Sequence, residues 1–372
     1  MKLRISLRSV SKALSTAASD ATARIPLTTA SKELASFLRD GASNITVLTG
    51  AGVSTDSAIP DYRGENGTYT LNPDYKPVFF QAFVALDEAR HRYWARSFLG
   101  FPPIMTTEPN PTHYALAALQ SPLSSLPAGP MQDTMDNQQP PRSGFIRNFI
   151  TQNVDGLHQK AGAKNVTELH GTLHRVKCMS CGHEEDRSDF QQVLADLNPE
   201  WDDLLQSQSA SRLYSRMNAD GDVELKSPEQ QQQQHQQISS KDKVLDYRTF
   251  QYPTCSCCGS GHYKPSVVFF GENIPVATKE STTQAILESN GLLVIGTSLA
   301  TFSAFRLVKL AKDTGVPIAI VNLGQSRGDA LANLRYDENS SLLLKAVAQE
   351  LGLGDIPGVI KRKKRVMNVV GS

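Results

Sequence analysis

Four of the five cysteines in this chain stand in two closely spaced pairs. Cys178 and Cys181 form one Cys-x-x-Cys-Gly turn, and Cys255 and Cys258 form a second. Four thiolates presented by two tight turns can complete a closed tetrahedral zinc site, which has no open position for catalysis. The spacing therefore predicts one structural zinc ion in preference to free thiols. Cys257 is the spare cysteine, because Cys258 repeats the spacing and the trailing glycine of the first turn.

A second group of candidate residues follows an apolar segment, residues 45–49, which is typical of a buried strand. Gly50 and Gly52 come next and allow the backbone to approach a ligand closely. A nucleotide-binding α/β fold holds a pyrophosphate at such a turn, on backbone N–H groups and the positive end of the next helix. Position 55 is Thr55 instead of the third glycine of the dinucleotide fingerprint, so this pattern alone leaves an ordinary tight turn equally open. The polar segment 59–63 supplies an acid, an aromatic ring and a guanidinium group that can bind phosphate.

Polar residues also follow a second predicted strand, residues 145–151, whose carboxyl end carries the tetrad 152–155. Ligands bind at that end of the strands in an open α/β sheet. Two amides and a carboxylate there are able to grip a ribose and position a water. This tetrad is weak evidence alone, because polar residues commonly follow strands. His170 stands in a Leu-His-Gly context, and a lone histidine is more often structural than catalytic.

Together these blocks closely resemble the signature segments of the sirtuins, a family of NAD-dependent protein deacylases. The segments that carry the resemblance are residues 50–63, 151–158 and 168–171, within a region of similarity from 31 to 351. Residues 61–63, 92–96 and 110–111 are most similar to the class II branch, the mitochondrial sirtuin-four type. Ala58 stands where the family usually has glycine, and Tyr62 stands where many members have phenylalanine. Neither departure removes a reacting group.

The resemblance implies a Rossmann-type parallel sheet with helices on both faces, formed by residues 27–170 and 265–355. A small zinc-binding domain, residues 171–264, is inserted between these two parts. NAD would lie at the carboxyl ends of the strands, and an acyl-lysine protein substrate would bind beside residues 268–272. The implied catalytic residues are His170, Asn153 and Asp155. The implied NAD contacts are Gly50, Ala51, Gly52, Ser54, Asp61, Tyr62, Arg63, Gln152, Asn153, Val154, Asp155, Gly296, Thr297, Ser298, Asn322, Leu323, Gly324 and Ser340.

The resemblance also implies a mechanism in which NAD is consumed. The acyl carbonyl oxygen attacks the ribose carbon that holds nicotinamide, while Asn153 and Asp155 orient the ribose and a water. His170 then acts as general base on a ribose hydroxyl, and the products are free lysine and O-acyl-ADP-ribose. Three alternatives stay open: ADP-ribosyl transfer to a protein at the same site, hydride transfer by an oxidoreductase, and a non-catalytic NAD sensor.

Hydrophobic periodicity predicts the elements that position these residues. A helix begins with Ser31 as N-cap and ends at Gly41. Segment 264–272 is predicted to be an extended segment that ends in a turn, and segments 292–298 and 316–324 are predicted to be buried strands. Further helices are predicted near residues 93–99, 189–205, 301–313 and 340–350. The start of residues 64–105 shows little hydrophobic periodicity, which is compatible with a mobile lid over the cofactor or with a plain surface loop.

Length and composition bound the remaining possibilities. The chain has 372 residues, 40% of them hydrophobic, which is enough for one large domain and a small one. A net charge of +1 gives no bias toward nucleic acid or membrane partners. No apolar run approaches the roughly 20 residues that span a bilayer. We therefore expect a soluble protein, and a monomer.

Four segments stand apart from the folded regions in composition. Residues 1–26 contain arginine, lysine and serine but no acid before Asp20, and on a helix they form an amphipathic surface. This pattern is typical of a mitochondrial transit peptide and predicts the matrix, with a disordered tail as the alternative. Residues 121–144 are a proline-rich insertion, and residues 227–240 contain five consecutive glutamines. Residues 356–372 form a basic tail; a solvated tail is favoured there over a nuclear localisation signal.

Overall fold

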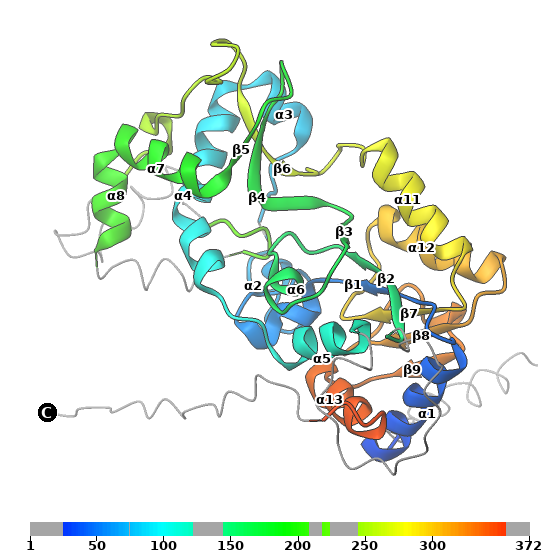
Figure 1. The fold of residues 1–372 in the computed structure, drawn as a ribbon. Helices are drawn as coiled ribbons and strands as arrows, with labels where there is room; N and C mark the ends of the chain where they lie inside the picture. The colour runs from blue at the N-terminus through cyan, green and yellow to red at the C-terminus, as the bar shows by residue number, and fades with distance from the viewer. Residues whose placement is uncertain (1–24, 74, 122–143, 208–217, 224–244, 355–372) are drawn as a thin grey trace, which may run out of the picture.

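The computed structural model of the protein describes residues 25–73, 75–121, 144–207, 218–223 and 245–354, which are coloured in Figure 1. The predicted transit peptide, apart from its last two residues, lies outside the described residues. So do the glutamine-rich insertion and the basic tail, together with the proline-rich insertion between residues 121 and 144.

A six-stranded sheet forms the centre of the larger lobe. Its strands are β1 (Ile45–Thr49), β2 (Ile146–Thr151), β3 (Val166–Glu168), β7 (Gly291–Ile295), β8 (Ile318–Val321) and β9 (Leu334–Tyr336). The spatial order is β3-β2-β1-β7-β8-β9, and every neighbouring pair is parallel. The chain winds outward in one direction from β1 and in the other direction from β7. Ligands bind at such a switch point, beyond the carboxyl ends of the strands.

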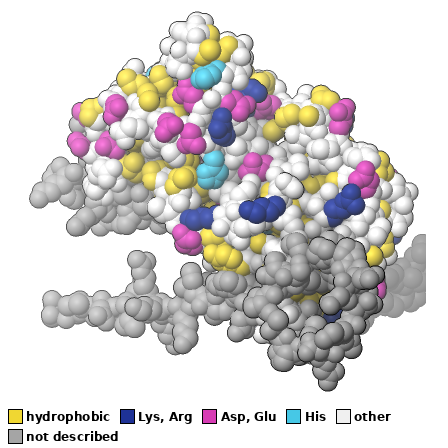
Figure 2. All heavy atoms as spheres, in the orientation of Figure 1, with side chains coloured by type: hydrophobic (Ala, Val, Ile, Leu, Met, Phe, Trp, Pro, Cys, Tyr) yellow, Lys and Arg dark blue, Asp and Glu magenta, His cyan; other side chains and the backbone are white. Residues whose placement is uncertain are grey.

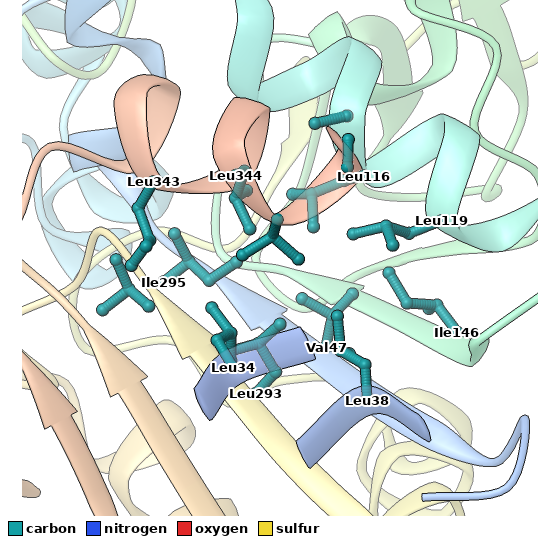
Figure 3. Packing of buried hydrophobic residues seen from close by; sticks show 14 of the residues in the cluster. Leu34, Leu38, Val47, Leu116, Leu119, Ile146, Leu293, Ile295, Leu343 and Leu344 are labelled. Atoms are coloured by element: carbon teal, nitrogen blue, oxygen red, sulfur yellow. The ribbon is translucent and has the colours of Figure 1, made fainter. Parts of the chain in front are cut away.

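Helices cover both faces of this sheet, as a parallel sheet requires. Helices α1 (Leu27–Asp40), α5 (Pro111–Gln120) and α13 (Ser340–Glu350) cover one face, and α11 (Val276–Leu287) and α12 (Phe302–Asp313) cover the other (Figure 1). Val47 packs with Leu34 and Leu344 in the first core (Figure 3), whereas its neighbour Leu48 packs with Leu307 in the second. Burying one such side chain contributes about 1.5–3 kcal/mol. These two cores therefore fix the strand ends that carry the site.

The smaller lobe has an antiparallel sheet of three strands in the order β5-β4-β6. They are β4 (Gly171–Cys178), β5 (Glu184–Asp186) and β6 (Tyr263–Val267). Around them lie α3 (Phe80–Ala85), α4 (Asp87–Thr106), α7 (Arg187–Leu197), α8 (Pro199–Gln206) and the 3-10 helix η3 (Tyr247–Thr249). An aromatic core that includes Trp94, Phe98, Phe190 and Phe250 joins these elements. This lobe thus combines α3 and α4 with residues that follow β4 in the sequence, and it lies at the upper left of Figure 1.

The first helix starts earlier than the sequence suggests. It begins at Leu27, with Pro26 at the N-cap position, and the predicted cap Ser31 lies inside it. A proline at the start of a helix loses no intrahelical hydrogen bond, because the first N–H groups have no partner there. The Ser31 hydroxyl instead donates to the Thr28 carbonyl at 3.1 Å. The predicted end is confirmed, since Gly41 is the C-cap.

Two other predicted elements differ in detail. The turn after Gly50 leads into a 3-10 helix, η1 (Ala51–Ser57), and not into the α-helix of a dinucleotide fingerprint. The helix expected over 189–205 is divided between α7 and α8, because Pro199 starts the second. The remaining short elements are α2 (Thr68–Leu71), α6 (Leu157–Lys160) and η4 (Asp329–Leu331).

Within the described ranges, no helix has both the length and the apolar character needed to cross a bilayer. Figure 2 shows acidic and basic side chains interspersed on one face of the molecule.

Candidate active site

A cleft of about 2150 Å³ opens where the two lobes meet the carboxyl ends of β1, β2 and β7. Pockets for one small molecule usually occupy roughly 300–1,000 Å³, so this cleft has room for two substrates. Of the predicted NAD contacts, all but Gly50 and Ser340 line it, and His170 and residues 268–272 line it as well. The fold therefore brings together predicted residues that are up to 273 positions apart in the sequence, from Ala51 to Gly324.

The turns after β1 and β7 pack backbone against backbone. The Gly52 N–H donates to the Gly296 carbonyl at 2.9 Å. A Cβ atom on Gly52 would lie 2.9 Å from that carbonyl oxygen, and one on Gly50 would lie 2.6 Å from the Thr297 Cβ. Glycine is needed here because the two strand ends approach each other closely. This contact forms the floor of the cleft at the switch point of the sheet.

Polar side chains at the end of β2 form a fixed, nearly buried group. The Ser54 hydroxyl donates to Asp155 Oδ2 at 2.7 Å, and the Asn153 amide donates to the Ser54 hydroxyl oxygen at 3.1 Å. Asp155 Oδ1 accepts from the Leu157 N–H at 2.9 Å. Both carboxylate oxygens of Asp155 thus have partners, which fixes the carboxylate where it faces the cleft.

Gln152 connects three strands at the same edge of the sheet. Its amide nitrogen donates to the Thr297 hydroxyl at 2.9 Å and to the Thr49 carbonyl at 3.2 Å. Its backbone carbonyl lies 3.1 Å from Nδ1 of His170. The residue therefore sets the position of the histidine relative to the strand ends.

The hydrogen bonds of His170 define its tautomer. A carbonyl oxygen only accepts, so Nδ1 carries the proton in its contact with Gln152. Nε2 then holds the lone pair and accepts from the Ser303 hydroxyl at 2.7 Å. Burial lowers the pKa of His170 to about 4, although the Gln152 carbonyl acts in the opposite direction. The ring is neutral at physiological pH and presents an unprotonated nitrogen to the cleft. Ser303, in the first turn of α12, is a partner that no feature of the sequence singles out.

Two more histidines lie buried behind the strand ends. His158 Nε2 is 2.9 Å from the Thr49 hydroxyl, which donates to the Thr151 hydroxyl at 2.8 Å. The Thr151 oxygen accepts from the Asn153 N–H at 3.1 Å. His113 stacks beside His158, with ring centroids 4.7 Å apart. This chain of contacts supports the backbone of Asn153, and no feature of the sequence singles out either histidine for that role.

The loop after η1 carries the predicted acid, aromatic ring and guanidinium. The Gly64 N–H donates to Asp61 Oδ1 at 2.8 Å, and the Arg63 guanidinium lies 5.3 Å from the centre of the Tyr69 ring. The Tyr62 hydroxyl donates to Asp220, a residue from the region between the two cysteine pairs. Burial raises the pKa of Tyr62, and Asp220 adds to that shift, so its hydroxyl stays a donor.

The far end of the cleft is formed by the turn after β8. The Asn322 amide donates to the carbonyls of Leu323 and Gly324 at 3.0 and 3.2 Å. Gly324 has a φ of +73°, which favours glycine. Ser340, by contrast, does not line the cleft, and its hydroxyl lies 2.9 Å from that of Thr112.

The four predicted zinc ligands meet in the smaller lobe. Their sulfurs all lie within 4.8 Å of one another, with Cys178–Cys258 at 3.8 Å and Cys181–Cys255 at 3.7 Å. Tetrahedral zinc with Zn–S bonds of about 2.3 Å separates its sulfurs by about 3.8 Å, so the cluster fits that ion. Cys257 is not a member of the cluster. None of the four ligands lines the cleft, as expected for a structural site.

Backbone N–H groups add to the fit of the cysteine cluster. Ser180 and Gly261 donate to the sulfurs of Cys178 and Cys258 at 3.4 and 3.3 Å, and such contacts stabilise thiolates. A Cβ on Gly261 would lie 2.3 Å from the Cys178 sulfur, so a larger residue would displace a ligand. The four cysteines are therefore positioned to hold a structural zinc ion.

The Sir2 family profile matches residues 50–127 and 141–303, which is more than half of the chain. The chain belongs to the Sir2 family. It is 43% identical over 325 residues to "NAD-dependent protein deacylase SIR4" of Batrachochytrium dendrobatidis, covering 86% of this chain and 93% of that protein. It is 36% identical over 316 residues to "NAD-dependent protein lipoamidase sirtuin-4, mitochondrial" of Homo sapiens, covering 85% of each. The predicted family and its sirtuin-four likeness are confirmed.

Solved structures agree with the fold of this Sir2-family protein. One described as "Sir2-p53 peptide-NAD+" matches with a TM-score of 0.57 at 25% identity, covering 87% of this chain and 98% of that one. Together with the strand order and the cysteine cluster, this match confirms the predicted fold class, a Rossmann-type parallel sheet with a zinc-binding small lobe.

Proposed function

We propose that this Sir2-family protein is an NAD-dependent protein-lysine deacylase that releases nicotinamide and O-acyl-ADP-ribose. The observation that carries the proposal is the neutral His170, with Nδ1 held by the Gln152 carbonyl and Nε2 facing a cleft large enough for two substrates. The names of its deacylase relatives support the activity. A solved relative with a peptide and NAD+ supports the two substrates.

NAD is proposed to lie along the turns 51–54, 61–63, 152–155, 296–298 and 322–324. It supplies a ribose carbon from which nicotinamide can leave. Asn153 and Asp155, fixed by Ser54, hold the ribose and a water. His170 takes a proton from a ribose hydroxyl through Nε2, and the Ser303 hydroxyl must leave that nitrogen when substrates bind. General base catalysis of this kind contributes roughly 10²–10⁴-fold to the rate.

The acyl-lysine segment is proposed to bind beside residues 268–272. The Val268 N–H donates to the His170 carbonyl at 2.7 Å, so this stretch, which leads from β6 into a turn at Gly271, is directly linked to the proposed catalytic histidine. Glu272 stabilises the stretch by accepting from the Phe269 N–H at 2.8 Å and from Lys264 Nζ at 3.0 Å. An extended backbone beside a cleft can pair with a substrate strand through main-chain hydrogen bonds.

A panel of acyl-lysine peptides incubated with the purified protein and NAD tests the reaction. We expect free nicotinamide, deacylated peptide and O-acyl-ADP-ribose in equal amounts, measured by mass spectrometry. Hydride transfer would leave the nicotinamide bond intact, and a sensor would release no product. If nicotinamide is released and ADP-ribose is found attached to a protein, the reaction at this site is ADP-ribosyl transfer and not deacylation.

We also propose that the protein acts in the mitochondrial matrix. The amphipathic, acid-poor start of the chain and the relatives named as mitochondrial support this location. Residues 1–30 fused to a reporter should carry it into mitochondria, and mutation of Arg4, Arg8 and Lys12 to Glu should block import. A whole-chain reporter that stays nuclear until residues 361–365 are neutralised would contradict the proposal.

A further inference from the structure

Residues 218–223, here called the clasp segment, lie between the two cysteine pairs in sequence. In space they contact the loop that follows η1, residues 61–69. The Ala219 N–H donates to the Thr68 hydroxyl at 3.1 Å. The Val223 N–H donates to the Arg96 carbonyl of α4 at 3.3 Å. Asn218, Ala219 and Asp220 line the cleft. The clasp segment therefore links the smaller lobe to the wall of the site.

Asp220 is the main contact between the clasp segment and that wall. Its carboxylate accepts hydrogen bonds from the hydroxyls of Tyr62 and Tyr75, the second at 2.7 Å. Tyr62 lines the cleft, whereas Tyr75 does not. Burial raises the pKa of Asp220, and the neighbouring Asp222 carboxylate adds to that shift. Burial also raises the pKa of both tyrosines, so both remain donors to Asp220.

The clasp segment has its own anchors, which do not involve Tyr62. Asp222 forms an ion pair with Arg96 at 2.7 Å, and the Arg96 side chain is fully buried. The Asn218 amide donates to Asp222 Oδ1 at 2.8 Å. Gly221 has a φ of +68°, and a Cβ on Gly100 would lie 2.4 Å from the Gly221 carbonyl oxygen. Asp220 is thus presented from a rigid support.

The loop that Asp220 contacts is closed by its own backbone. The Thr68 N–H donates to the Asp61 carbonyl at 2.8 Å, and the Tyr69 N–H donates to the Tyr62 carbonyl at 2.9 Å. Fixing the Tyr62 side chain therefore fixes the orientation of the whole unit, including Arg63. A loop that is already ordered loses less conformational entropy when its ligand binds.

We propose that Asp220 is a positioning residue for NAD, which holds Tyr62 and thereby orients Asp61 and Arg63 toward the cofactor. The inference rests on the proposed function, because it takes NAD to bind against this loop. It assigns to the region between the zinc ligands a part in cofactor binding. A purely structural role would instead lower stability without a selective change in the KM for NAD.

Steady-state kinetics with NAD and an acyl peptide test the proposal. Asp220→Asn removes the charge and one acceptor, and we expect the KM for NAD to rise about tenfold, the size of one hydrogen bond to a charged group. We expect kcat and the peptide KM to stay within about threefold. Tyr62→Phe should reproduce the effect, and the double variant should be no worse than either single one. Tyr75→Phe is the matched control, because it removes the other hydrogen bond to Asp220 outside the cleft wall.

Hydrogen exchange of the protein without NAD provides a second measurement. In Asp220→Asn the amides of Thr68 and Tyr69 should lose protection, while the zinc content stays at one per chain. Tyr62→Phe removes the same hydrogen bond from the loop side and replaces Asp220→Asn if that variant does not fold.

Three results would overturn the inference. The first two are unchanged protection of these amides and an unchanged KM for NAD in Asp220→Asn. The third is additivity: Asp220→Asn raises the KM for NAD by the same factor in the Tyr62→Phe background as in the wild type. A wild-type protein that releases no nicotinamide would contradict the proposed function instead, and the exchange measurement does not depend on that activity.

Discussion

The catalytic cleft and the zinc lobe both gather residues from distant parts of the chain, but they hold them by different means. At the cleft, strands β1 and β7 are buried along their whole length, and the apolar sides of helices pack on both faces of the sheet. In the smaller lobe, a three-stranded sheet shares its aromatic core with Cys178 and Cys255, two of the zinc ligands. Hydrophobic burial stabilises the first region, and the second also depends on a metal.

This difference has a consequence for how the two regions respond to substitution. Side chains at the edge of the large sheet can be changed without removing its cores, because they lie beyond the strand ends. A zinc ligand cannot be changed in this way, because metal binding and the folding of a small lobe are coupled. Both tryptophans of the chain, Trp94 and Trp201, lie in the core of the smaller lobe. Their fluorescence therefore reports on that lobe separately.

The largest expected effect is the loss of zinc in Cys178→Ser or Cys258→Ser. Structural zinc sites contribute about 10–16 kcal/mol of apparent binding free energy, so the smaller lobe should unfold. We expect zinc content to fall from one per chain to none and tryptophan emission to shift to longer wavelength. Far-UV circular dichroism should retain the signal of the large sheet and its helices. Cys257→Ser is the control and should keep its zinc; zinc loss in that variant alone would contradict the ligand assignment.

His170→Ala should remove the chemistry and leave both regions folded. We expect kcat to fall about 10²–10⁴-fold, which is the usual contribution of a general base. Thermal unfolding, tryptophan emission and NAD affinity should stay near those of the wild type, because the ring lies in the cleft wall and not in a core. Deacylation at the wild-type rate would rule out this assignment.

Acid should weaken the region behind the cleft through its buried histidines. Burial lowers the pKa of His113 to about 4, with Asp155 acting in the opposite direction, and it lowers the pKa of His158 as well. A histidine that is neutral when folded contributes its full stability above a pH of about 6.5, and that contribution is lost as the pH falls toward 4. At pH 5.5 His113 alone should lower the free energy of unfolding by about 1 kcal/mol relative to pH 7.5.

Denaturant unfolding of the wild type and of His113→Gln at several pH values measures this contribution. The difference between the two proteins isolates the histidine, because the zinc thiolates are common to both. The wild type should lose more stability than the variant between pH 7.5 and 5.5. Equal pH dependence in the two proteins would show that His113 is not the group responsible.

The same contrast explains what the sequence could predict. Strands β1 and β7 were predicted because a strand buried on both faces is a short apolar run. The zinc ligands were predicted because chelation needs local pairs. His170 was identified through its resemblance to a family motif. Ser303, His113 and the clasp segment were missed, since their roles come from single contacts between distant residues that leave no periodic pattern. The start of α1 was misplaced because Ser31 carries a local N-cap signal, while the helix begins at Leu27 with Pro26 at the N-cap position.

The smallest expected effect concerns Ser303, the partner of His170 across the cleft. Its hydroxyl donates to the unprotonated Nε2, and a hydrogen bond to the neutral form of a histidine lowers its pKa. Ser303→Ala should therefore raise the pKa of His170 by up to about one unit, because such a bond contributes about 0.5–1.5 kcal/mol. The acid limb of kcat/KM should move to higher pH, while zinc content and tryptophan emission stay unchanged. Ser303→Thr keeps the hydroxyl and should restore the wild-type profile. An acid limb that is identical in Ser303→Ala and the wild type would show that the hydroxyl does not tune the base.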